Sequence, residues 1–542
     1  MNLVSIAYKR GHSMHVHFIK KRNPMVLVVV FIGIWLLTMM PPTRHTAAIP
    51  HGLTTHDWQI LTSFFPPTQQ AFFKASNTGP QDFFGSRVAV DDDTVVITAP
   101  QEDSSTTGVN STPNEEASES GAAYVFVRTN GLWTQQAYLK PSNTSPGDAF
   151  GESVAIDQDT IVIGAFKEDS STTGVNSMPN EEALNAGAAY VFVRTNGLWT
   201  QQAYLKASNT DADDAFGTAV SVSQDSIVVS AINEDSSTTG VNSTPNEEAL
   251  NAGAAYVFVR TNELWTQQAY FKASNTGADD MFGRSVALYA TTLVVGAYLE
   301  DSNTRGVNNP PNEAAPDAGA AYVFERVNGH WVQQAYLKAS NPGETDRFGI
   351  SVALESSTIV VGAYLEDSST AGGQSDPNEQ APDAGAAYVF VRIMDTWYPQ
   401  AYLKASNIDA GDRFGASVAV HGDLLLIGAY LEASSSSGID SIPNNDAPGA
   451  GAAYLFLRTN HRWTQQSYLK ASNTGLNDTF GIRGALYQGT IVIGAYQEDS
   501  STVGVNPPSN EEASDSGAAY VYTTTMLVPN PHRAYLPWAG RE

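Results

Sequence analysis

The residues of this chain that could do chemistry are carboxylates placed at a regular spacing in long polar segments. A Glu-Asp pair such as Glu102-Asp103 begins six of the seven segments, and a second cluster such as Asn114-Glu115 follows in the same segment. Calcium takes about six to eight oxygen ligands from carboxylates, amides and carbonyls, and each segment holds enough of them. The pattern predicts calcium at these candidate ligands: Glu102, Asp103, Glu168, Asp169, Glu234, Asp235, Glu300, Asp301, Glu366, Asp367, Glu498 and Asp499.

The alternative is an acidic, proline-pinned loop that is solvated and binds nothing specific. The polar segment recurs in seven copies along the chain, one in each of the 66-residue repeats described below. The sixth copy departs from the pattern, because Glu432-Ala433 stands where the others have Glu-Asp, and Asn444-Asn445 replaces the second cluster. Long loops without secondary structure are uncommon unless they are functional or disordered, so both readings stay open.

Three further polar positions are identical in all seven copies. We expect the Asp and Asn side chains to cap a turn through hydrogen bonds to the backbone, and the Lys to project outward from its strand. A ring of seven polar sites is the functional alternative. The residues are Asp82, Asp148, Asp214, Asp280, Asp346, Asp412 and Asp478; Lys74, Lys140, Lys206, Lys272, Lys338, Lys404 and Lys470; and Asn77, Asn143, Asn209, Asn275, Asn341, Asn407 and Asn473.

Other side chains give little support to catalysis. There is no cysteine, and His330, His421 and His461 each lie in a different copy. No G-x-S-x-G, H-E-x-x-H or phosphate-loop motif occurs. We therefore expect no enzyme, although paired carboxylates leave a carbohydrate-active site as the alternative.

Six tryptophans, one per hairpin, invite the interpretation of a carbohydrate platform. Packing at the blade edge is the reading we favour. They are Trp133, Trp199, Trp265, Trp331, Trp397 and Trp463.

The dipeptide Phe-Gly sets the period of all these residues. It returns every 66 residues, and this means one unit copied in tandem. Each unit contains four short β-prone runs separated by turn residues, without a helical apolar period. The seven positions are Phe84-Gly85, Phe150-Gly151, Phe216-Gly217, Phe282-Gly283, Phe348-Gly349, Phe414-Gly415 and Phe480-Gly481.

The two ends of the array predict a closed ring. Residues 69–74 match residues 135–140 but precede the first Phe-Gly, and the seventh copy stops after Tyr522 without its fourth strand. Pairing of the first segment with the last sheet would complete it. The fold class is therefore all-β, a seven-bladed β-propeller of four-stranded blades closed by the N-terminal strand.

These motifs resemble the FG-GAP repeat, the blade unit of the integrin α-subunit head and of many bacterial surface proteins. A Gly-Ala-Pro-like element follows each Phe-Gly, as at Thr98-Ala99-Pro100 and Gly164-Ala165-Phe166. The resemblance implies a seven-bladed propeller with ligand-binding loops on one face and, frequently, bound calcium. The usual D-x-D-x-D-G loop is absent, so that family metal site does not carry over.

Composition and the N-terminal segment point outside the cell. A net charge of -27 over 542 residues repels phosphate backbones, so we expect no nucleic-acid partner. Met25 to Met40 are nearly all apolar, follow Lys20-Lys21-Arg22, and precede Ala48. This order is typical of a signal peptide, with an uncleaved anchor as the alternative.

The predicted organisation is a signal peptide or membrane anchor at 1–48, a linker at 49–68, the propeller at 69–525 and a tail at 526–542. Strand polarity places the seven acidic loops on one face, which is the predicted ligand surface. We expect an exported, extracellular or cell-surface monomer that binds an extracellular protein or glycan. The alternative is a structural surface module that binds nothing.

Overall fold

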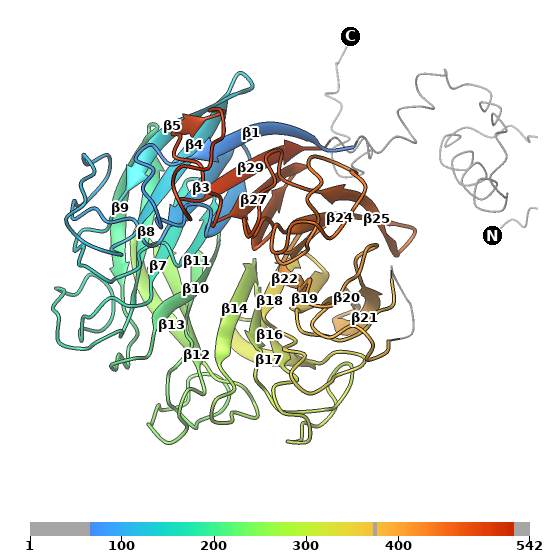
Figure 1. Cartoon of the computed structure of the whole chain (residues 1–542). Coiled ribbons are helices and arrows are strands. Elements are labelled where there is room, and N and C mark those ends of the chain that lie inside the picture. Colours follow the sequence, from blue (N-terminus) through green and yellow to red (C-terminus); the bar gives the residue numbers. More distant parts are fainter. Residues whose placement is uncertain (1–65, 372–376, 525–542) are drawn as a thin grey trace, which may run out of the picture. The chain divides into compact units, whose positions relative to one another are not determined.

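Seven β-sheets stand around a central axis in the computed structural model (Figure 1), which describes residues 66–371 and 377–524. The predicted leader at 1–48 and tail at 526–542 lie outside the described residues, as do Gly372 to Ser375 of the fifth copy. Within the described ranges, no helix is long and apolar enough to cross a membrane.

Each blade is an antiparallel sheet whose strands follow chain order, except in the last blade. Blade 1 contains β2 (Arg87–Asp91), β3 (Thr94–Ala99), β4 (Ala122–Thr129) and β5 (Leu132–Leu139); blade 2 contains β6 (Ser153–Asp157), β7 (Thr160–Ala165), β8 (Ala188–Thr195) and β9 (Leu198–Leu205); blade 3 contains β10 (Phe216–Ser223), β11 (Ser226–Ala231), β12 (Ala254–Thr261) and β13 (Leu264–Phe271). Blade 4 contains β14 (Phe282–Tyr289), β15 (Thr292–Ala297), β16 (Ala320–Val327) and β17 (His330–Leu337); blade 5 contains β18 (Ser351–Glu355), β19 (Thr358–Ala363), β20 (Ala386–Ile393) and β21 (Thr396–Leu403). Blade 6 contains β22 (Phe414–His421), β23 (Leu424–Ala429), β24 (Ala452–Thr459) and β25 (Arg462–Leu469); blade 7 contains β26 (Arg483–Tyr487), β27 (Thr490–Ala495), β29 (Ala518–Thr523), β1 (Thr68–Lys74) and β28 (Gly504–Val505).

The ring closes as predicted, because β1 is the outer strand of blade 7. It pairs antiparallel with β29, with Thr68 opposite Thr523 and Phe72 opposite Tyr520. The short strand β28 then pairs with the far edge of β1. The two ends of the repeat array are therefore held together by backbone hydrogen bonds, and the buried ring of Phe73 stacks on Phe126 of blade 1.

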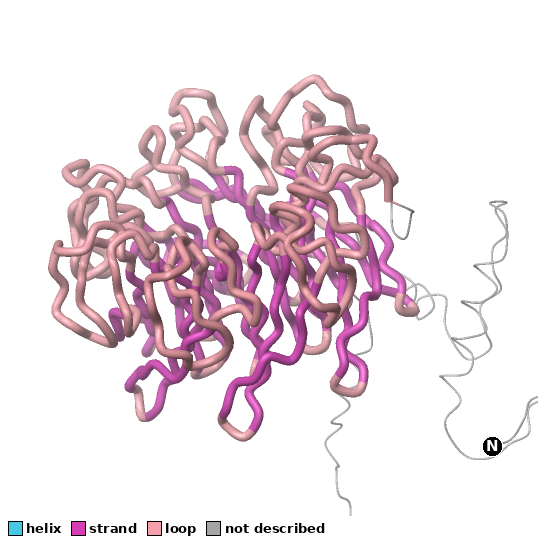
Figure 2. The backbone as a smooth tube through the Cα atoms, turned by 90° about the horizontal axis from the view of Figure 1, so that it is seen from below, coloured by secondary structure: helices cyan, strands magenta, loops and turns pink. Residues whose placement is uncertain are grey.

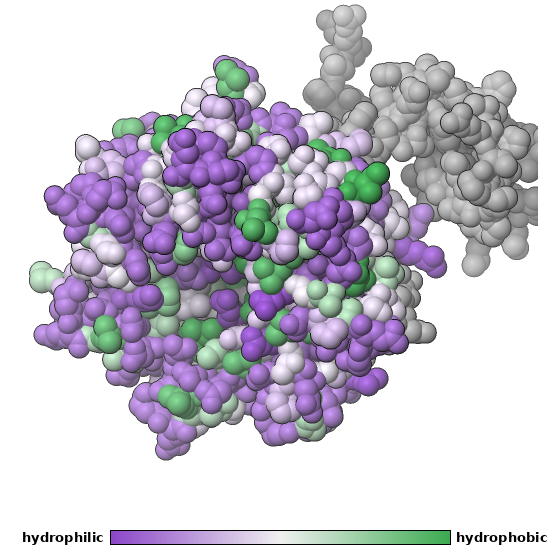
Figure 3. All heavy atoms as spheres, in the orientation of Figure 1, coloured by the Kyte–Doolittle hydropathy of each residue, from purple (hydrophilic) through white to green (hydrophobic). Residues whose placement is uncertain are grey.

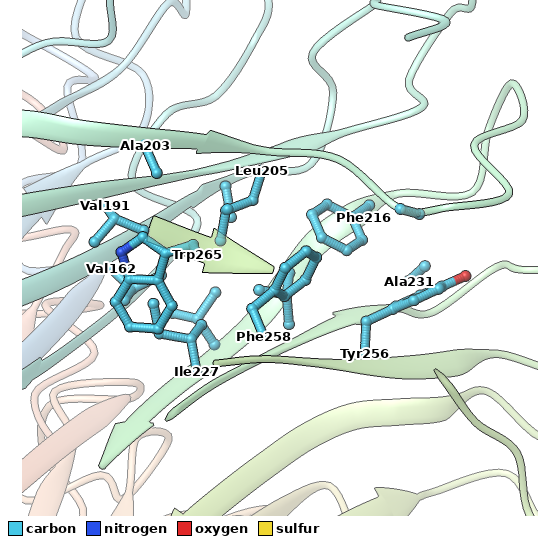
Figure 4. Close-up of a cluster of buried hydrophobic side chains, with 14 of the residues drawn as sticks. Val162, Val191, Ala203, Leu205, Phe216, Ile227, Ala231, Tyr256, Phe258 and Trp265 are labelled. Atoms are coloured by element: carbon cyan, nitrogen blue, oxygen red, sulfur yellow. The ribbon is translucent and has the colours of Figure 1, made fainter. Parts of the chain in front are cut away.

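The core consists of apolar layers between adjacent blades. The second strands are buried along their whole length and rich in β-branched residues, as expected for strands covered on both faces. Figure 4 shows one such layer, in which Phe216, Tyr256 and Phe258 of blade 3 lie against Val191 and Leu205 of blade 2. The ring of Phe216 meets that of Tyr256 edge-on at 5.5 Å.

The Phe-Gly dipeptide connects each blade to the previous one through a backbone hydrogen bond and close packing. Its phenylalanine is fully buried, and the Phe216 amide donates a hydrogen bond to the Ala186 carbonyl of the previous blade at 3.0 Å. Gly217 has φ +100, and a Cβ added there would lie 2.3 Å from the Ala188 carbonyl oxygen. Only glycine tolerates both the left-handed backbone and the close approach.

The variant Gly217→Ala is expected to lose about 2–3 kcal/mol of unfolding free energy, because the blades must separate to admit a methyl group. The matched control is Gly197→Ala, at a hairpin glycine with φ +80 and no atom within 4 Å of the added Cβ. It should lose only about 1 kcal/mol from the left-handed backbone. Chemical denaturation measures both, and equal losses would refute a role of Gly217 in blade contact.

Seven long loops connect the second and third strands, and Figure 2 shows them at one side of the ring, with short hairpin turns at the other. The exposed surface of their described residues is called the loop face below; these residues are 100–121, 166–187, 232–253, 298–319, 364–371 with 377–385, 430–451 and 496–517.

The long loops also cover the outer edges of the blades. In blade 1, Val109 forms a β-bridge with Leu139, and the Asn110 amide donates to the Tyr138 carbonyl at 2.8 Å. An uncovered edge strand would offer unpaired backbone groups to other chains. Part of the loop therefore covers the outer strand in blades 1, 2, 3, 4 and 6, and β28 does so in blade 7.

Candidate functional site

The glutamate of the Glu-Asp pair lies inside the blade. Glu102 is 1% exposed. Its Oε1 accepts from Asn77 Nδ2 at 2.8 Å and from the Tyr138 hydroxyl at 2.7 Å. Its Oε2 accepts from Lys140 Nζ and the Ser104 amide, both at 3.1 Å. Four donors therefore satisfy this carboxylate.

The prediction that the repeated lysines project outward is wrong. Lys140 is 0% exposed, and its Nζ also donates to the Gly121 carbonyl at 2.6 Å. The sequence could not show this, because the long loop folds back over the end of the fourth strand and brings the glutamate to the ammonium. The ion pairs are Lys74–Glu498, Lys140–Glu102, Lys206–Glu168, Lys272–Glu234, Lys338–Glu300, Lys404–Glu366 and Lys470–Glu432.

The repeated Asp and Asn differ in their partners. Asp82 caps its turn as predicted, since its Oδ2 accepts from the Gly79 amide at 2.7 Å. The same prediction is wrong for Asn77, whose Oδ1 accepts from the Tyr124 hydroxyl at 2.8 Å while its amide donates to Glu102. Asn77 follows the last strand of blade 7, so it links that blade to blade 1.

The aspartate of the Glu-Asp pair fastens the far end of its loop. Asp103 Oδ1 accepts from the Glu119 amide at 2.8 Å, and Glu119 has a left-handed backbone with φ 54. Blade 6 has Ala433 at the aspartate position, and Gly449 with φ 69 at the left-handed one. Glycine adopts the left-handed backbone without steric cost, so this turn does not need the hydrogen bond to an aspartate. The other aspartates and amide donors are Asp169–Asn185, Asp235–Asn251, Asp301–Asp317, Asp367–Asp383 and Asp499–Asp515.

The predicted calcium ligands are thus already engaged within the protein. Among the described residues, no group of three or more His, Cys, Asp or Glu side chains is placed to hold a metal ion. A calcium ion at Glu102 would have to displace Lys140. Calcium binding by these loops therefore stays a prediction, and the structure gives the Glu-Asp pair a clear structural role.

Burial raises the pKa of the turn-capping aspartates far above the ordinary value. The pKa of Asp148, which is 2% exposed, rises from 3.8 to about 8 through burial, opposed by the Ser145 amide and reinforced by Glu168 and Glu181. The pKa of Asp214 also rises to about 8, and those of Asp82, Asp280, Asp346, Asp412 and Asp478 rise to about 7, with burial as the largest cause.

The variant Asp148→Asn is expected to stabilise the protein at pH 8. The folded pKa of about 8 lies above the unfolded value of 3.8, so ionisation opposes folding, and the loss grows as the pH rises from about 4 to 8. A pKa difference of one is worth about 1.4 kcal/mol. The shift of about four therefore sets an upper limit of about 5–6 kcal/mol. The net gain should be smaller, but at least about 1 kcal/mol, because asparagine also weakens the bond from the Ser145 amide.

Urea denaturation at several pH values measures the effect of Asp148→Asn. The advantage over the wild type should shrink as the pH falls from 8 to below 4, where Asp148 is neutral in both the folded and the unfolded chain. The control is Asp159→Asn, at an aspartate that pairs with Arg194 on the hairpin side of the ring. A pH-independent difference for Asp148→Asn would contradict the raised pKa.

The tryptophans are packing residues, as the favoured reading predicted. All six are buried, and the Trp199 indole donates to Gln136 of the previous blade at 2.8 Å. The Arg194 guanidinium lies 5.0 Å from the same ring. Because these faces are covered, they are not available as platforms for sugars.

Sequence reasoning missed three arginines on the first strands of the blades. Arg87, Arg284 and Arg483 line a cavity on the axis of the ring. The signal was present in the printed sequence, since Ser153 and Ser351 occupy the position of Arg87 in other copies. At this position arginine breaks the repeat, whereas the motifs that define the blade match in all seven copies.

The geometry defines the class of this protein: a closed, seven-bladed β-propeller built from tandem copies of one four-stranded unit. The model of the FG-GAP repeat matches residues 67–126, 133–192, 199–258, 265–324, 331–390, 397–456 and 463–522. The chain belongs to the FG-GAP repeat family, whose repeats are typical of extracellular or surface proteins. A comparison with the curated proteins found no match.

Proposed function

We propose that this FG-GAP propeller is an exported binding module that holds an extracellular protein or glycan through its loop face. The observation that carries the proposal is that the acidic residues of a loop have two different roles. Glu102 and Asp103 are committed to the fold, whereas Glu115 and Glu116 are exposed and have no cationic partner among the described residues. Exposed, ordered side chains on a rigid scaffold are typical of binding surfaces.

The exposed carboxylates are unevenly distributed around the ring, and this favours one side for the partner. Blades 7, 1, 2 and 3 each carry two adjacent glutamates at the loop tip, whereas blades 4 and 5 carry one and blade 6 has Asn445 and Asp446. The exposed pairs are Glu115 and Glu116, Glu181 and Glu182, Glu247 and Glu248, and Glu511 and Glu512. A partner with a basic surface would be attracted to this side.

A screen of purified extracellular proteins and an array of glycans would test the proposal. Binding should weaken as salt is raised, and should be lost when the eight paired glutamates are replaced by glutamine. The control variant is Glu263→Gln, at an exposed hairpin residue on the opposite side of the ring. Retention of full affinity by the eightfold variant would refute the loop face as the binding surface.

A structural surface module is the second candidate, favoured by the bridges with which the loops seal the outer strands. Absence of any binding in both screens at low salt would support it.

The binding proposal includes assistance by calcium. Asp82, Glu102, Asp103 and Glu115 act on one another electrostatically, and a cation would relieve their repulsion. Millimolar calcium should then raise the midpoint of thermal unfolding, and magnesium at equal ionic strength is the control. An unchanged midpoint would leave the loops without a metal.

A further inference from the structure

A cavity of about 220 Å³ lies on the axis of the propeller and is lined by the first strand of every blade. These strands, β2, β6, β10, β14, β18, β22 and β26, are neighbours of one another around the ring. The lining residues lie at or near the start of each strand, beside the Phe-Gly connectors and thus close to the ends of the long loops. Figure 3 shows the molecule hollowed near the centre of the ring, with hydrophilic and hydrophobic residues side by side at its border.

The charge of this axial cavity is opposite to that of the whole chain. Its lining contains Arg87, Arg284 and Arg483 and no acidic residue; the other lining residues are small, hydroxyl-bearing or apolar. Glu152 forms an ion pair with Arg87. One carboxylate therefore faces three guanidinium groups within a protein whose net charge is -27.

Two of the three arginines have no carboxylate partner among the described residues. Arg483 donates only to its neighbouring carbonyl, that of Ile482, at 2.7 Å, and the Arg284 guanidinium lies 5.8 Å from the ring of Tyr298. Burial lowers the pKa of Arg483, and the nearby charges of Arg87 and Arg284 lower it further. The three cations are thus close enough to repel one another.

Two of the three arginines, Arg87 and Arg483, replace a residue that stabilises the ring in other copies. Where blades 1 and 7 have Arg87 and Arg483, blade 2 has Ser153, whose hydroxyl donates to the Gly217 carbonyl of the next blade at 2.7 Å. Blades 4, 5 and 6 repeat this bond through Ser285, Ser351 and Ser417. These arginines are half-buried. A partly desolvated cation without a counter-charge is costly, so the exchange of serine for arginine suggests that an anion completes the site.

Further arginines lie between tyrosines next to Arg284, which shares the ring of Tyr298 with Arg347. The Arg347 guanidinium lies 5.6 Å from the ring of Tyr298 and donates to the Tyr364 hydroxyl at 2.8 Å. Arg413 lies 5.6 Å from Tyr364 and 5.7 Å from Tyr430. The buried Nε atoms of Arg347 and Arg413 have no hydrogen-bond acceptor among the described residues.

We propose that the axial cavity binds a small multivalent oxyanion, a phosphate, sulfate or compact polycarboxylate, between Arg87, Arg284 and Arg483. The planar guanidinium group matches such oxygens in a bidentate manner. The cavity is smaller than the roughly 300–1,000 Å³ of pockets for drug-sized ligands. The acidic loop face would repel a long polyanion, and this favours a small anion over a nucleic acid or sulfated polymer. The site goes beyond the proposed loop-face function and does not depend on it.

Isothermal titration calorimetry tests the proposal. The full chain is titrated with phosphate, sulfate and citrate at constant ionic strength. At least one of the three should bind, while chloride should not compete at the same ionic strength. Arg483→Ser, which introduces the residue of the other blades and should fold, is expected to weaken binding at least about tenfold. Glu152→Gln should strengthen it by about three- to tenfold, because it removes the competing carboxylate.

The charge-matched control is Arg462→Ser, at an exposed hairpin residue of β25, which should bind as the wild type does. Absence of binding by all three anions would overturn the proposal, as would equal losses in Arg483→Ser and Arg462→Ser. Binding of a long sulfated polymer alone would also overturn it. The loop-face variants leave these arginines in place, so the two proposals can fail separately.

Discussion

Replacing Lys140 with methionine is expected to lower the free energy of unfolding by about 3–5 kcal/mol, because it leaves the buried Glu102 carboxylate without its cation. Glu102 is 1% exposed and also accepts from Asn77, Tyr138 and Ser104. Those neutral donors cannot neutralise its charge. The loss should appear in urea denaturation followed by tryptophan fluorescence, since Trp133 is buried in the same blade.

The double variant Lys140→Met/Glu102→Gln separates the cost of an unpaired charge from the loss of packing. It should recover a large part of the stability lost in Lys140→Met, because no charge is then buried alone. Lys167→Met is the control, as its ammonium lies 5.4 Å from the ring of Phe166 and has no carboxylate partner among the described residues. If the double variant is no more stable than Lys140→Met, the ion pair is not the cause of the loss.

A disulfide between the two ends of the ring is expected to raise the free energy of unfolding by up to about 5 kcal/mol, since it closes a very long loop of the unfolded chain. Thr68 on β1 and Thr523 on β29 are direct partners in the closing pair of strands. Opposite residues of antiparallel strands have Cα atoms about 4.5–5.5 Å apart, within the range that a disulfide spans. The chain has no other cysteine, so Thr68→Cys/Thr523→Cys can form only this bond within one molecule.

Mobility on a non-reducing gel and denaturation with and without a reducing agent would measure the effect. Each single cysteine variant is a control and should behave as the wild type in the presence of reductant. The gain should vanish on reduction. Failure of the two thiols to react under mild oxidation would be evidence against the observed closure of the ring.

The repeat pattern predicted most of the fold because the features that define a blade are local. The short β-prone runs, the turn residues between them and the Phe-Gly element each specify a strand or a turn within a few residues. The one long-range feature that could be predicted, closure by residues 69–74, followed from counting strands: an unpaired fourth strand at one end matched a missing one at the other. The structure confirms this pairing.

The polar residues were predicted less well, because their roles depend on contacts across the blade. Asp82 caps a turn only three residues away, and this local bond was predictable. Lys140 meets Glu102 only because the intervening loop folds back over its strand, and nothing in the spacing of the two residues indicates that both are buried.

The sequence by itself thus determined the number of blades, their strands and the closure of the ring, since local periodicity and turn chemistry suffice for these. Only the tertiary structure decided what the charged residues do. Seven glutamates became internal counter-ions of seven lysines, and three arginines from blades 1, 4 and 7 came together on the axis. The physical reason is that burial and charge pairing depend on distances between residues far apart in the chain, which are set when the blades pack into a ring.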